Sequence, residues 1–363
     1  MKVIINKDVV LEGLQKVQSI VGTKTTLPVL YNVFLKAEDD KVFLTATNID
    51  VTVRTSVQAT VSREGGTTLP ARRLTSIIRE LPATDIEINV DDKDVATIKA
   101  GSSRFKIIGI SDEEFPALPS LEEGKTYSVD QGIFRRMLLS TSYAASHEES
   151  RYVLNGVLLN FKEDKLNMVA TDGRRMALYE EPVEFPDELA GDYIVPSTAV
   201  NELLKTLGAE GKMRIVAGQN QITFEFDDIY IVSKLIEGTF PNFRQVIPSA
   251  CEERVMVERE QLLTAIKRVS LVSDKSNTVN LVFSKNHLEL QASAQDIGEA
   301  SETLAVKYSG KEIKISFNPE YLMDCLRSLT SDEVALEISD DLSPGVVKCD
   351  APFLYVLMPM RVR

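Results

Sequence analysis

The sequence predicts an α+β protein built from three copies of one domain. Two observations carry this prediction. Short amphipathic helices recur at intervals of about 120 residues, and runs rich in valine, threonine, phenylalanine and leucine lie between them. A chain of 363 residues with 44% hydrophobic content also exceeds the usual size of one hydrophobic core. Each copy is expected to contain two β-α-β-β-β halves.

One set of predicted helices has apolar residues at relative positions 0, 3, 4 and 7, a spacing that places them on one helix face. These stripes are Leu74, Ile77, Ile78, Leu81; Val200, Leu203, Leu204, Leu207; and Leu322, Cys325, Leu326, Leu329. Four residues ahead of each stripe stands a helix start signal. The signals are Pro70, Pro196, and Asn318 followed by Pro319.

A second set of helices repeats its apolar residues at relative positions 0, 4, 7 and 11. Its members are Val10, Leu14, Val17, Val21; Phe134, Leu138, Thr141, Ala145; and Leu262, Ile266, Val269, Ser273. The third member is weakest at its end, where serine replaces an apolar residue. One helix from each set is expected in every copy.

Strand character fills the spaces between these helices. In the first copy, strands are expected over 29–36, 41–47 and 51–58, and after the second helix over 85–90, 95–100 and 104–110. A short strand motif recurs as Leu44-Thr45-Ala46-Thr47, Met168-Val169-Ala170-Thr171 and Leu290-Gln291-Ala292-Ser293.

Aromatic–proline pairs interrupt the strands where one copy gives way to the next. They stand at Phe115–Pro116 and Phe240–Pro241. Proline lacks a backbone donor and stops strands, so these positions suit linkers. The predicted domains are therefore 1–121, 122–248 and 249–363.

Charge is distributed unevenly between the elements. A net charge of −13 argues against a nucleic-acid partner, because phosphate binding depends on lysine and arginine. The predicted helices, however, hold twelve cations against nine acids, which leaves them near +3 and the rest of the chain near −16. Helices with a mildly basic face on an acidic sheet would attract phosphate locally. The alternative is that the helices simply expose long charged side chains to solvent.

Searches for chemistry find no catalytic, metal or cofactor site. Cys251, Cys325 and Cys349 are odd in number and lack metal-ligand spacing, which favours free thiols in a reducing compartment. The two histidines, His147 and His287, likewise lack ligand spacing. Phosphate-binding loops and nucleophile elbows are absent, and Asp172 has no paired nucleophile. We expect a protein that is not an enzyme and that needs no cofactor.

Location follows from the lack of targeting and membrane signals. Charge at Lys7 and Asp8 interrupts the amino-terminal apolar run before it could act as a secretion signal. No stretch approaches the roughly 18 apolar residues of a membrane span. We expect a cytoplasmic protein without a membrane partner.

Four motifs spread over the chain carry a resemblance to a known family. They are Lys24-Thr25-Thr26-Leu27-Pro28-Val29-Leu30, Arg151-Tyr152-Val153-Leu154-Asn155-Gly156, Ala170-Thr171-Asp172-Gly173-Arg174-Arg175 and Met358-Pro359-Met360-Arg361. In order and spacing they resemble the beta sliding clamp of bacterial DNA polymerase III. The resemblance covers the whole chain.

The resemblance implies the DNA clamp fold and a processivity factor of DNA polymerase. Two chains would join head to tail into a ring of six domains, with helices inside and sheets outside, which encircles double-stranded DNA without reading its sequence. An ATP-dependent clamp loader would open the ring. The homodimer interface would pair a first-domain strand bearing Phe105 and Ile107 with a third-domain helix end bearing Leu271 and Val272. These four could instead be ordinary core residues.

The resemblance also implies DNA-contacting positions. The matching residues are Lys24, Arg72, Glu148, Tyr152 and Val153. Glu148 stands where an amide is expected, and Val153 stands where a second aromatic is expected. A carboxylate cannot donate to phosphate and valine cannot stack on a base, so neighbouring His147 and Arg151 are added as candidates.

The second implied site is a pocket between the second and third domains for peptide segments of the replicative polymerase and other clamp-binding-motif proteins. The matching positions are Leu154, Thr171, Gly173, Arg174, Arg175, Met176, Pro241, Val246, Leu342, Val356, Leu357, Met358, Pro359 and Met360. A methionine-rich apolar segment near the carboxyl terminus suits varied partners. The same segment could also be the closing core strand of the third domain.

Two other functions remain open from the residues alone. The repeats could support an enzyme whose active site is assembled from residues distant in sequence. They could equally form an oligomeric adaptor that binds peptides without enclosing DNA.

Overall fold

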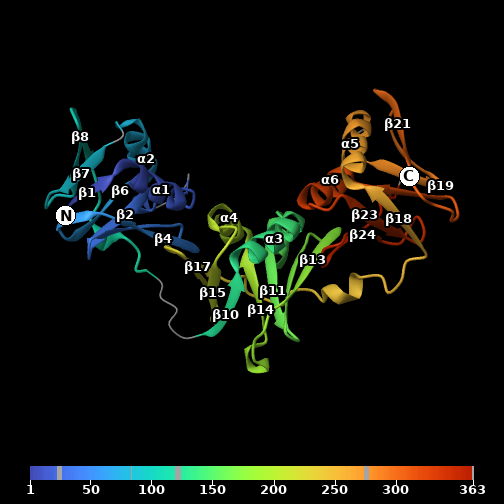
Figure 1. Cartoon of the computed structure of the whole chain (residues 1–363), viewed down its shortest axis with the longest axis horizontal. Helices are drawn as coiled ribbons and strands as arrows, with labels where there is room; N and C mark the ends of the chain where they lie inside the picture. The colour runs from blue at the N-terminus through green and yellow to red at the C-terminus, as the bar shows by residue number, and fades with distance from the viewer. Residues whose placement is uncertain (23–26, 83, 119–123, 274–277, 362–363) are drawn as a thin grey trace. The chain divides into compact units, whose positions relative to one another are not determined.

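The computed structural model describes residues 1–22, 27–82, 84–118, 124–273 and 278–361. Its internal contacts divide the chain into two units. Unit 1 comprises Met1–Arg135 and Thr198–Leu235, and unit 2 comprises Arg136–Ser197 and Ile236–Arg363. Figure 1 shows the elements of each unit in chain order.

The elements follow one order in all three copies. In the first copy a strand and helix, β1 and α1, precede three strands, and a second strand and helix, β6 and α2, precede three more. The bounds are β1 Lys2–Asn6, α1 Lys7–Gln18, β2 Asn32–Glu38, β3 Lys41–Thr47, β4 Val51–Gln58, β5 Thr60–Arg63, β6 Gly65–Pro70, α2 Ala71–Glu80, β7 Asp85–Val90, β8 Val95–Ala100 and β9 Ser103–Ile108. The short β5 has no counterpart in the other copies.

The second and third copies repeat the predicted β-α-β-β-β halves, which confirms the fold class. The second consists of β10 Lys125–Asp130, α3 Gln131–Thr141, β11 Gly156–Lys162, β12 Lys165–Thr171, β13 Arg175–Pro182, β14 Gly191–Pro196, α4 Ser197–Thr206, β15 Lys212–Ala217, β16 Gln221–Phe226 and β17 Ile229–Lys234. The third consists of β18 Glu253–Glu258, α5 Arg259–Val269, β19 Val279–Ser284, β20 His287–Ala294, β21 Gly298–Ala305, β22 Ile313–Phe317, α6 Pro319–Ser328, β23 Glu333–Ile338, β24 Gly345–Lys348 and β25 Phe353–Leu357.

Helix starts agree with the sequence signals. The proline-marked helices begin at Ala71, Ser197 and Pro319. Asn318 caps α6 because its side-chain oxygen accepts from the Glu320 amide at 2.9 Å. Each helix then buries its apolar stripe, as Leu74 and Ile78 of α2 illustrate.

Two predicted boundaries were wrong. The strand expected over 29–36 begins only at Asn32, because Pro28–Tyr31 forms a 3-10 turn that proline at its start favours. The strand expected over 104–110 is Ser103–Ile108. The last stripe residues Val21, Ala145 and Ser273 also fall beyond their helices, whose ends lie at Gln18, Thr141 and Val269.

In unit 1 two sheets carry the packed helices α1 and α2. One sheet has the order β5-β1-β7-β8-β9, and the other has the order β10-β15-β16-β17-β4-β3-β2-β6. The second sheet joins strands of two copies, because β17 pairs antiparallel with β4. A continuous sheet thus links the first copy to half of the second.

Unit 2 is built in the same way. Its larger sheet has the order β14-β11-β12-β13-β25-β24-β23-β18, and its smaller sheet has the order β21-β20-β19-β22. Here β13 of the second copy pairs with β25 of the third. The helices α5 and α6 pack against each other within this unit (Figure 1). Because these sheets cross the copy boundaries, three copies give two compact units, and the domain limits at 121 and 248 stay a prediction.

Candidate functional site

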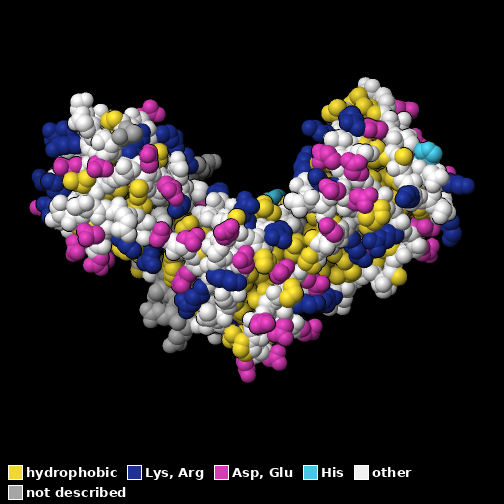
Figure 2. Space-filling view, in the orientation of Figure 1, with side chains coloured by type: hydrophobic (Ala, Val, Ile, Leu, Met, Phe, Trp, Pro, Cys, Tyr) yellow, Lys and Arg dark blue, Asp and Glu magenta, His cyan; other side chains and the backbone are white. Residues whose placement is uncertain are grey.

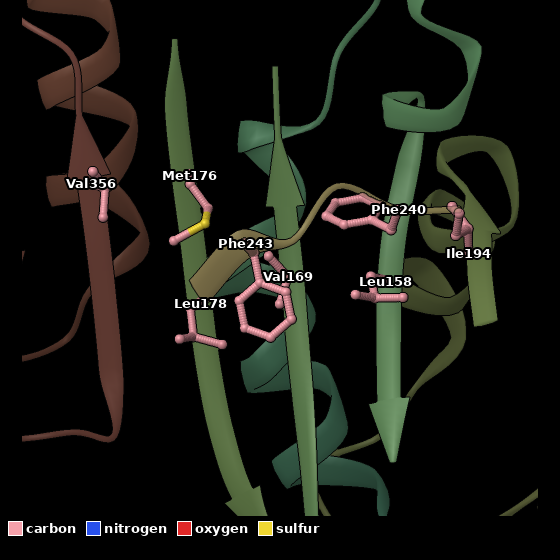
Figure 3. Packing of buried hydrophobic residues seen from close by; sticks show 8 residues of the cluster. All are labelled: Leu158, Val169, Met176, Leu178, Ile194, Phe240, Phe243 and Val356. Carbon is pink, nitrogen blue, oxygen red and sulfur yellow. The ribbon is translucent and has the colours of Figure 1, made fainter. Parts of the chain in front are cut away.

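A hydrophobic cluster lies on one face of the sheet that joins the second and third copies. Five neighbouring strands contribute Leu158, Val169, Met176, Leu178, Ile194 and Val356, as Figure 3 shows. Val356 belongs to the third copy and the others belong to the second. The cluster therefore forms at the β13–β25 junction.

The segment between the two copies covers this face. Its Phe240 and Phe243 lie against the strands as buried members of the cluster (Figure 3). The predicted Pro241 and Val246 come from the same segment and are exposed. Leu154 and Val153 pack against the cluster while partly buried.

A tight turn precedes β13 and brings four predicted residues together. The Asp172 carboxylate accepts from the Arg174 amide at 2.8 Å and from the Arg175 amide at 3.0 Å. The Thr171 hydroxyl accepts from the Gly173 amide at 3.1 Å. Gly173 has a φ of 85°, a left-handed conformation that glycine adopts without steric cost. Its backbone is exposed, so a ligand can approach this turn closely.

The carboxyl-terminal strand ends beside the same turn. The Met358 amide donates to the Arg174 carbonyl at 2.9 Å, and the Met358 side chain is 46% exposed. Met360 continues the segment, and its amide donates to the Ser316 carbonyl at 2.7 Å. Pro359 between them is partly exposed. The segment thus offers flexible apolar side chains beside the turn.

Leu357 lies on the other face of β25. Alternate side chains of a strand point to opposite faces, so Val356 joins the cluster whereas Leu357 lines the small third-copy core cavity with Leu281 and Phe317. The terminal segment is both core strand and candidate site, and the two roles fall on different residues.

Arg175 is buried at the base of the turn. Its guanidinium donates to the carboxylates of Asp172 at 3.0 Å and Asp324 at 2.8 Å, and to the Tyr143 carbonyl at 2.7 Å. Burial alone would lower its pKa, but Tyr355 and Asp324 leave that pKa raised above the ordinary arginine value. The side chain stays charged and fully engaged with the protein.

Neutral side chains are buried close to Arg175. Burial raises the pKa of the Cys325 thiol and those of the Tyr143 and Tyr355 hydroxyls, so all three remain neutral at physiological pH. A neutral, fully buried thiol is a packing residue rather than a nucleophile. This agrees with the structural role expected for Cys325.

Exposed hydrophobic side chains mark the outer part of this region. Leu342 and Val246 are more than half exposed, and Figure 2 shows hydrophobic side chains gathered over β13 and β24. Such a patch beside polar turn residues is typical of a binding surface. We therefore treat the cluster, the turn 171–175 and the segment 356–360 as one candidate pocket.

The predicted DNA-contacting loop of the second copy lies next to this pocket. His147, Glu148 and Tyr152 are exposed, whereas Val153 packs on the cluster. Arg151 forms an ion pair with Glu148 at 3.2 Å and donates to the Asp172 carbonyl at 2.5 Å. Its guanidinium is thus partly committed to the protein.

In the first copy, Arg72 is exposed on α2 and lines a hollow of about 460 Å³ with Arg73. Lys24 lies outside the described residues. The six α-helices of the described part of the chain carry twelve cations and seven acids, a net charge of about +5. The predicted +3 was too low because Asp130 and Glu258 end strands β10 and β18 instead of starting helices.

The predicted dimer residues lie on the edge strand β9 and in the 3-10 turn that follows α5. Phe105 is exposed on β9, an edge strand, whereas Ile107 is buried on its inner face. The exposed neighbour is Ile108, which the alternation of side chains along a strand would have indicated once the register was known. Leu271 is 78% exposed in the turn after α5, and Val272 is partly exposed.

Several residues of this region were not indicated by the resemblance. Phe240, Phe243 and Leu178 belong to the cluster, and Asp324 bonds to Arg175 without being part of the candidate pocket. The aromatic–proline pairs were interpreted as linkers, although aromatic residues in a linker are themselves a sign that the linker packs on a core.

Within 1–22, 27–82, 84–118, 124–273 and 278–361, no helix is long and apolar enough to cross a membrane. Over the same ranges, no group of three histidine, cysteine or acidic side chains could hold a metal ion.

Three family models match the chain in series. They describe the amino-terminal domain of the DNA polymerase III beta subunit over residues 1–119, its central domain over 128–242 and its carboxyl-terminal domain over 244–361. Together they cover all three copies of the repeat.

Relatives and solved structures agree with the models. The beta sliding clamp of Chlamydia muridarum is 35% identical over 363 residues, which is 100% of this chain and 99% of that protein. The sliding clamp of Pseudomonas aeruginosa bound to griselimycin has a TM-score of 0.95 at 33% identity, with all of both chains covered. The Bacillus subtilis clamp also has a TM-score of 0.95, at 26% identity with the same coverage. The chain therefore belongs to the DNA polymerase III beta subunit family, the bacterial beta sliding clamps.

Proposed function

We propose that two copies of this chain close head to tail into a ring that slides on duplex DNA and holds polymerase there through the candidate pocket. As a beta sliding clamp, the chain is a DNA polymerase processivity factor and not an enzyme. The observation that carries the ring proposal is the repeated strand junction between copies.

Two junctions inside the chain are built alike. Strand β4 of the first copy pairs with β17 of the second, and β13 of the second pairs with β25 of the third. The strands in the remaining equivalent positions are β21 of the third copy and β9 of the first. Both are edge strands with an unpaired side. Long unpaired edges invite pairing with another chain, and here a second copy supplies the matching edge.

The two internal junctions also indicate which residues would face one another at the proposed junction between two copies of the chain. The β8–β9 hairpin matches the β16–β17 hairpin, with Ala100 opposite Ser103 and Phe226 opposite Ile229. Lys106 of β9 therefore corresponds to Val232, which faces Thr52. Carried over to the proposed interface, Lys106 faces the third-copy counterpart of Thr52.

That counterpart is Glu299. Thr47 faces Thr52 in the first copy, and Ser293, the equivalent of Thr47 in the recurring strand motif, faces Glu299 in the third. Lys106 of one chain would thus lie opposite Glu299 of the partner subunit. Opposite charges placed across a strand pair favour both pairing and register.

Apolar residues complete the proposed interface. Ile108, 77% exposed, stands on the β9 side, and Phe105, which is also exposed, points to the opposite face of the same edge strand. On the other side Leu271 is the most exposed of the candidate interface residues. Large apolar side chains at that exposure suit a covered surface better than a solvated one.

The helices would face DNA. Their net positive charge, set against a chain of net charge −13, suits weak, sequence-blind attraction to phosphate. Arg72, His147 and Tyr152 are exposed and available for such contact. Glu148 pairs with Arg151, so we propose that contact in the second copy comes from His147 and Tyr152 rather than from the carboxylate.

The pocket would bind peptide segments of the replicative polymerase and of other clamp-binding-motif proteins. Its apolar floor, exposed methionine and glycine turn support this proposal. We extend it to griselimycin, with which the Pseudomonas aeruginosa clamp was solved. Ring opening would depend on a separate ATP-dependent clamp loader, and the site of action would be the cytoplasm.

Retention on DNA of two topologies tests the proposal. Protein assembled on nicked circular plasmid by a clamp loader should stay bound through gel filtration at high salt, because enclosure does not depend on phosphate contacts. Cutting the plasmid once should release it. Equal retention on circular and linear DNA would contradict enclosure and favour a non-encircling adaptor.

A further inference from the structure

Arg175 sits in the candidate pocket, yet it has little to offer a ligand. Each of its three guanidinium nitrogens donates to a protein acceptor, and the side chain is 8% exposed. The Tyr321 ring lies 4.2 Å from its Cζ atom and covers one face. A group enclosed in this way acts on the pocket through its protein partners.

We propose that Arg175 and Asp324 form a latch between copies that positions the walls of the pocket. Asp324 is on α6 of the third copy, and Arg175 follows the turn 171–175 of the second. In this role neither side chain contacts the bound peptide, and Asp324 is a positioning residue that the resemblance does not indicate. The proposal rests on the peptide-binding function proposed above.

The latch fastens α6 at more than one point. Tyr321 lies about one turn before Asp324, and its carbonyl accepts from the Tyr355 hydroxyl of β25 at 3.0 Å. The turn that Arg175 holds is itself bonded to the Met358 amide through the Arg174 carbonyl. Hydrogen bonds therefore connect helix α6, the turn 171–175 and the segment 356–360 into one frame around the candidate pocket.

The internal repeat supports this assignment independently. Asp324 follows the first residue of its helix stripe, Leu322, by two positions, as Glu202 follows Val200. Glu202 also reaches back to the preceding copy, where its carboxylate accepts from the Ser19 hydroxyl. An acidic side chain at this helix position thus accepts a hydrogen bond from the preceding copy at both internal junctions.

Only the second junction adds an arginine. Ser19 lies nine residues after Val10, and Tyr143 lies nine after Phe134, so the two occupy equivalent positions. At the first junction the acid meets Ser19 directly. At the second junction Arg175 bridges the acid and the Tyr143 carbonyl. Among the described residues, only Arg175 and Glu202 are both charged and buried.

The bond between Arg175 and Asp324 is lost when either side chain is truncated, although Asp172 still faces Arg175 and Arg327 still faces Asp324. Each single change should therefore disturb the frame about as strongly as both together. We would measure griselimycin binding by calorimetry for the variants Asp324→Ala, Arg175→Ala and the double variant. Each single change should weaken binding about tenfold, and the double variant should bind no more weakly than the worse single one. Asp324→Asn, which keeps an acceptor, should recover most of the affinity.

The matched control is Glu202→Ala. It truncates the equivalent buried acid at the junction without the pocket, and griselimycin affinity should stay at the wild-type value. Weakening by Arg175→Ala with no effect of Asp324→Ala would show direct ligand contact by Arg175 and would overturn the latch. Additive losses would overturn it as well.

Hydrogen exchange of the free protein tests the latch without any ligand. The Arg174 and Arg175 amides donate to Asp172 within the turn, so Asp324→Ala should increase exchange over 171–175, whereas Glu202→Ala should not. Unchanged protection of the turn in Asp324→Ala would overturn the proposal, whereas Asp324→Asn should keep most of the wild-type protection. If Asp324→Ala shows this response while wild-type protein does not bind griselimycin, the proposed ligand site fails and the latch stands.

Discussion

The two strand junctions inside the chain share one backbone design and differ in their side chains. At the first, Asn48 accepts from the amides of Asp50 and Val51, and at the second, Asp172 accepts from those of Arg174 and Arg175. The incoming strand ends in the same way, with the Lys234 amide bonded to the Asp50 carbonyl and the Met358 amide to the Arg174 carbonyl, both at 2.9 Å.

A bulky side chain and an ion pair at the turn of the first junction have no counterpart at the turn of the second. Ile49 occupies the turn of the first junction with a φ of 82°, where the second junction has Gly173 at 85°. Lys234 forms an ion pair with Asp50 at 3.0 Å, whereas the equivalent Met358 is an exposed apolar side chain. Two equivalent junctions can thus differ in bulk and charge with no change of fold, and the candidate pocket lies at the junction that has less of both.

The largest effect is expected from making the turn of the second junction resemble that of the first. Gly173→Ile would force a β-branched residue into the left-handed region and place a Cβ 2.8 Å from Nη1 of Arg151. Because the turn also forms a wall of the pocket, griselimycin affinity should fall more than about tenfold. Calorimetric titration measures the loss.

Gly101→Ile is the control for backbone strain. Gly101 also has a positive φ, of 56°, but an added Cβ there meets nothing within 4 Å. This variant should be destabilised while binding griselimycin with wild-type affinity. If Gly173→Ile also binds normally, the turn is not part of the pocket and the comparison loses its functional meaning.

A smaller effect is expected from the reverse exchange. Ile49→Gly removes the strain of a β-branched residue in the left-handed region, which costs ~1–2 kcal/mol. Part of this gain is lost because glycine makes the unfolded chain more flexible. The net gain in free energy of unfolding should be about 0.5–1 kcal/mol, measured as a higher urea midpoint.

Ile297→Gly provides the matching control, because Ile297 lies in the equivalent turn of the third copy, is exposed and has no positive φ. That variant should lower the urea midpoint. A lower midpoint for Ile49→Gly too would mean that the Ile49 side chain stabilises the first junction by packing, and that bulk rather than strain distinguishes the two turns.

Much of the fold could be predicted because it depends on local periodicity. The stripes at positions 0, 3, 4 and 7 gave helices that begin directly after Pro70 and Pro196, since proline and capping residues act within one turn. The strand at 29–36 was misplaced because the 3-10 turn Pro28–Tyr31 carries the same apolar residues as a strand.

The candidate site could be predicted only in part, because its residues meet across the fold. Thr171 to Met176 and Met358 to Met360 were found through short contiguous motifs. Asp324 was counted only as one acid among the helix charges, since nothing local to α6 indicates that Arg175, 149 residues earlier, would bond to it. The burial of Ile107 and the exposure of Ile108 could not be predicted, because the face of a strand depends on sheet register.

A third junction, equivalent to the two inside the chain, is proposed to join one copy to the next. Sedimentation equilibrium of Lys106→Glu, Glu299→Lys and the double variant tests it most directly. Each single reversal places like charges opposite one another at both ends and should shift the mass towards the 40.3 kDa monomer, whereas the double variant should restore a dimer. Single variants that remain as dimeric as the wild type, or a double variant weaker than either, would contradict the register and the junction it describes.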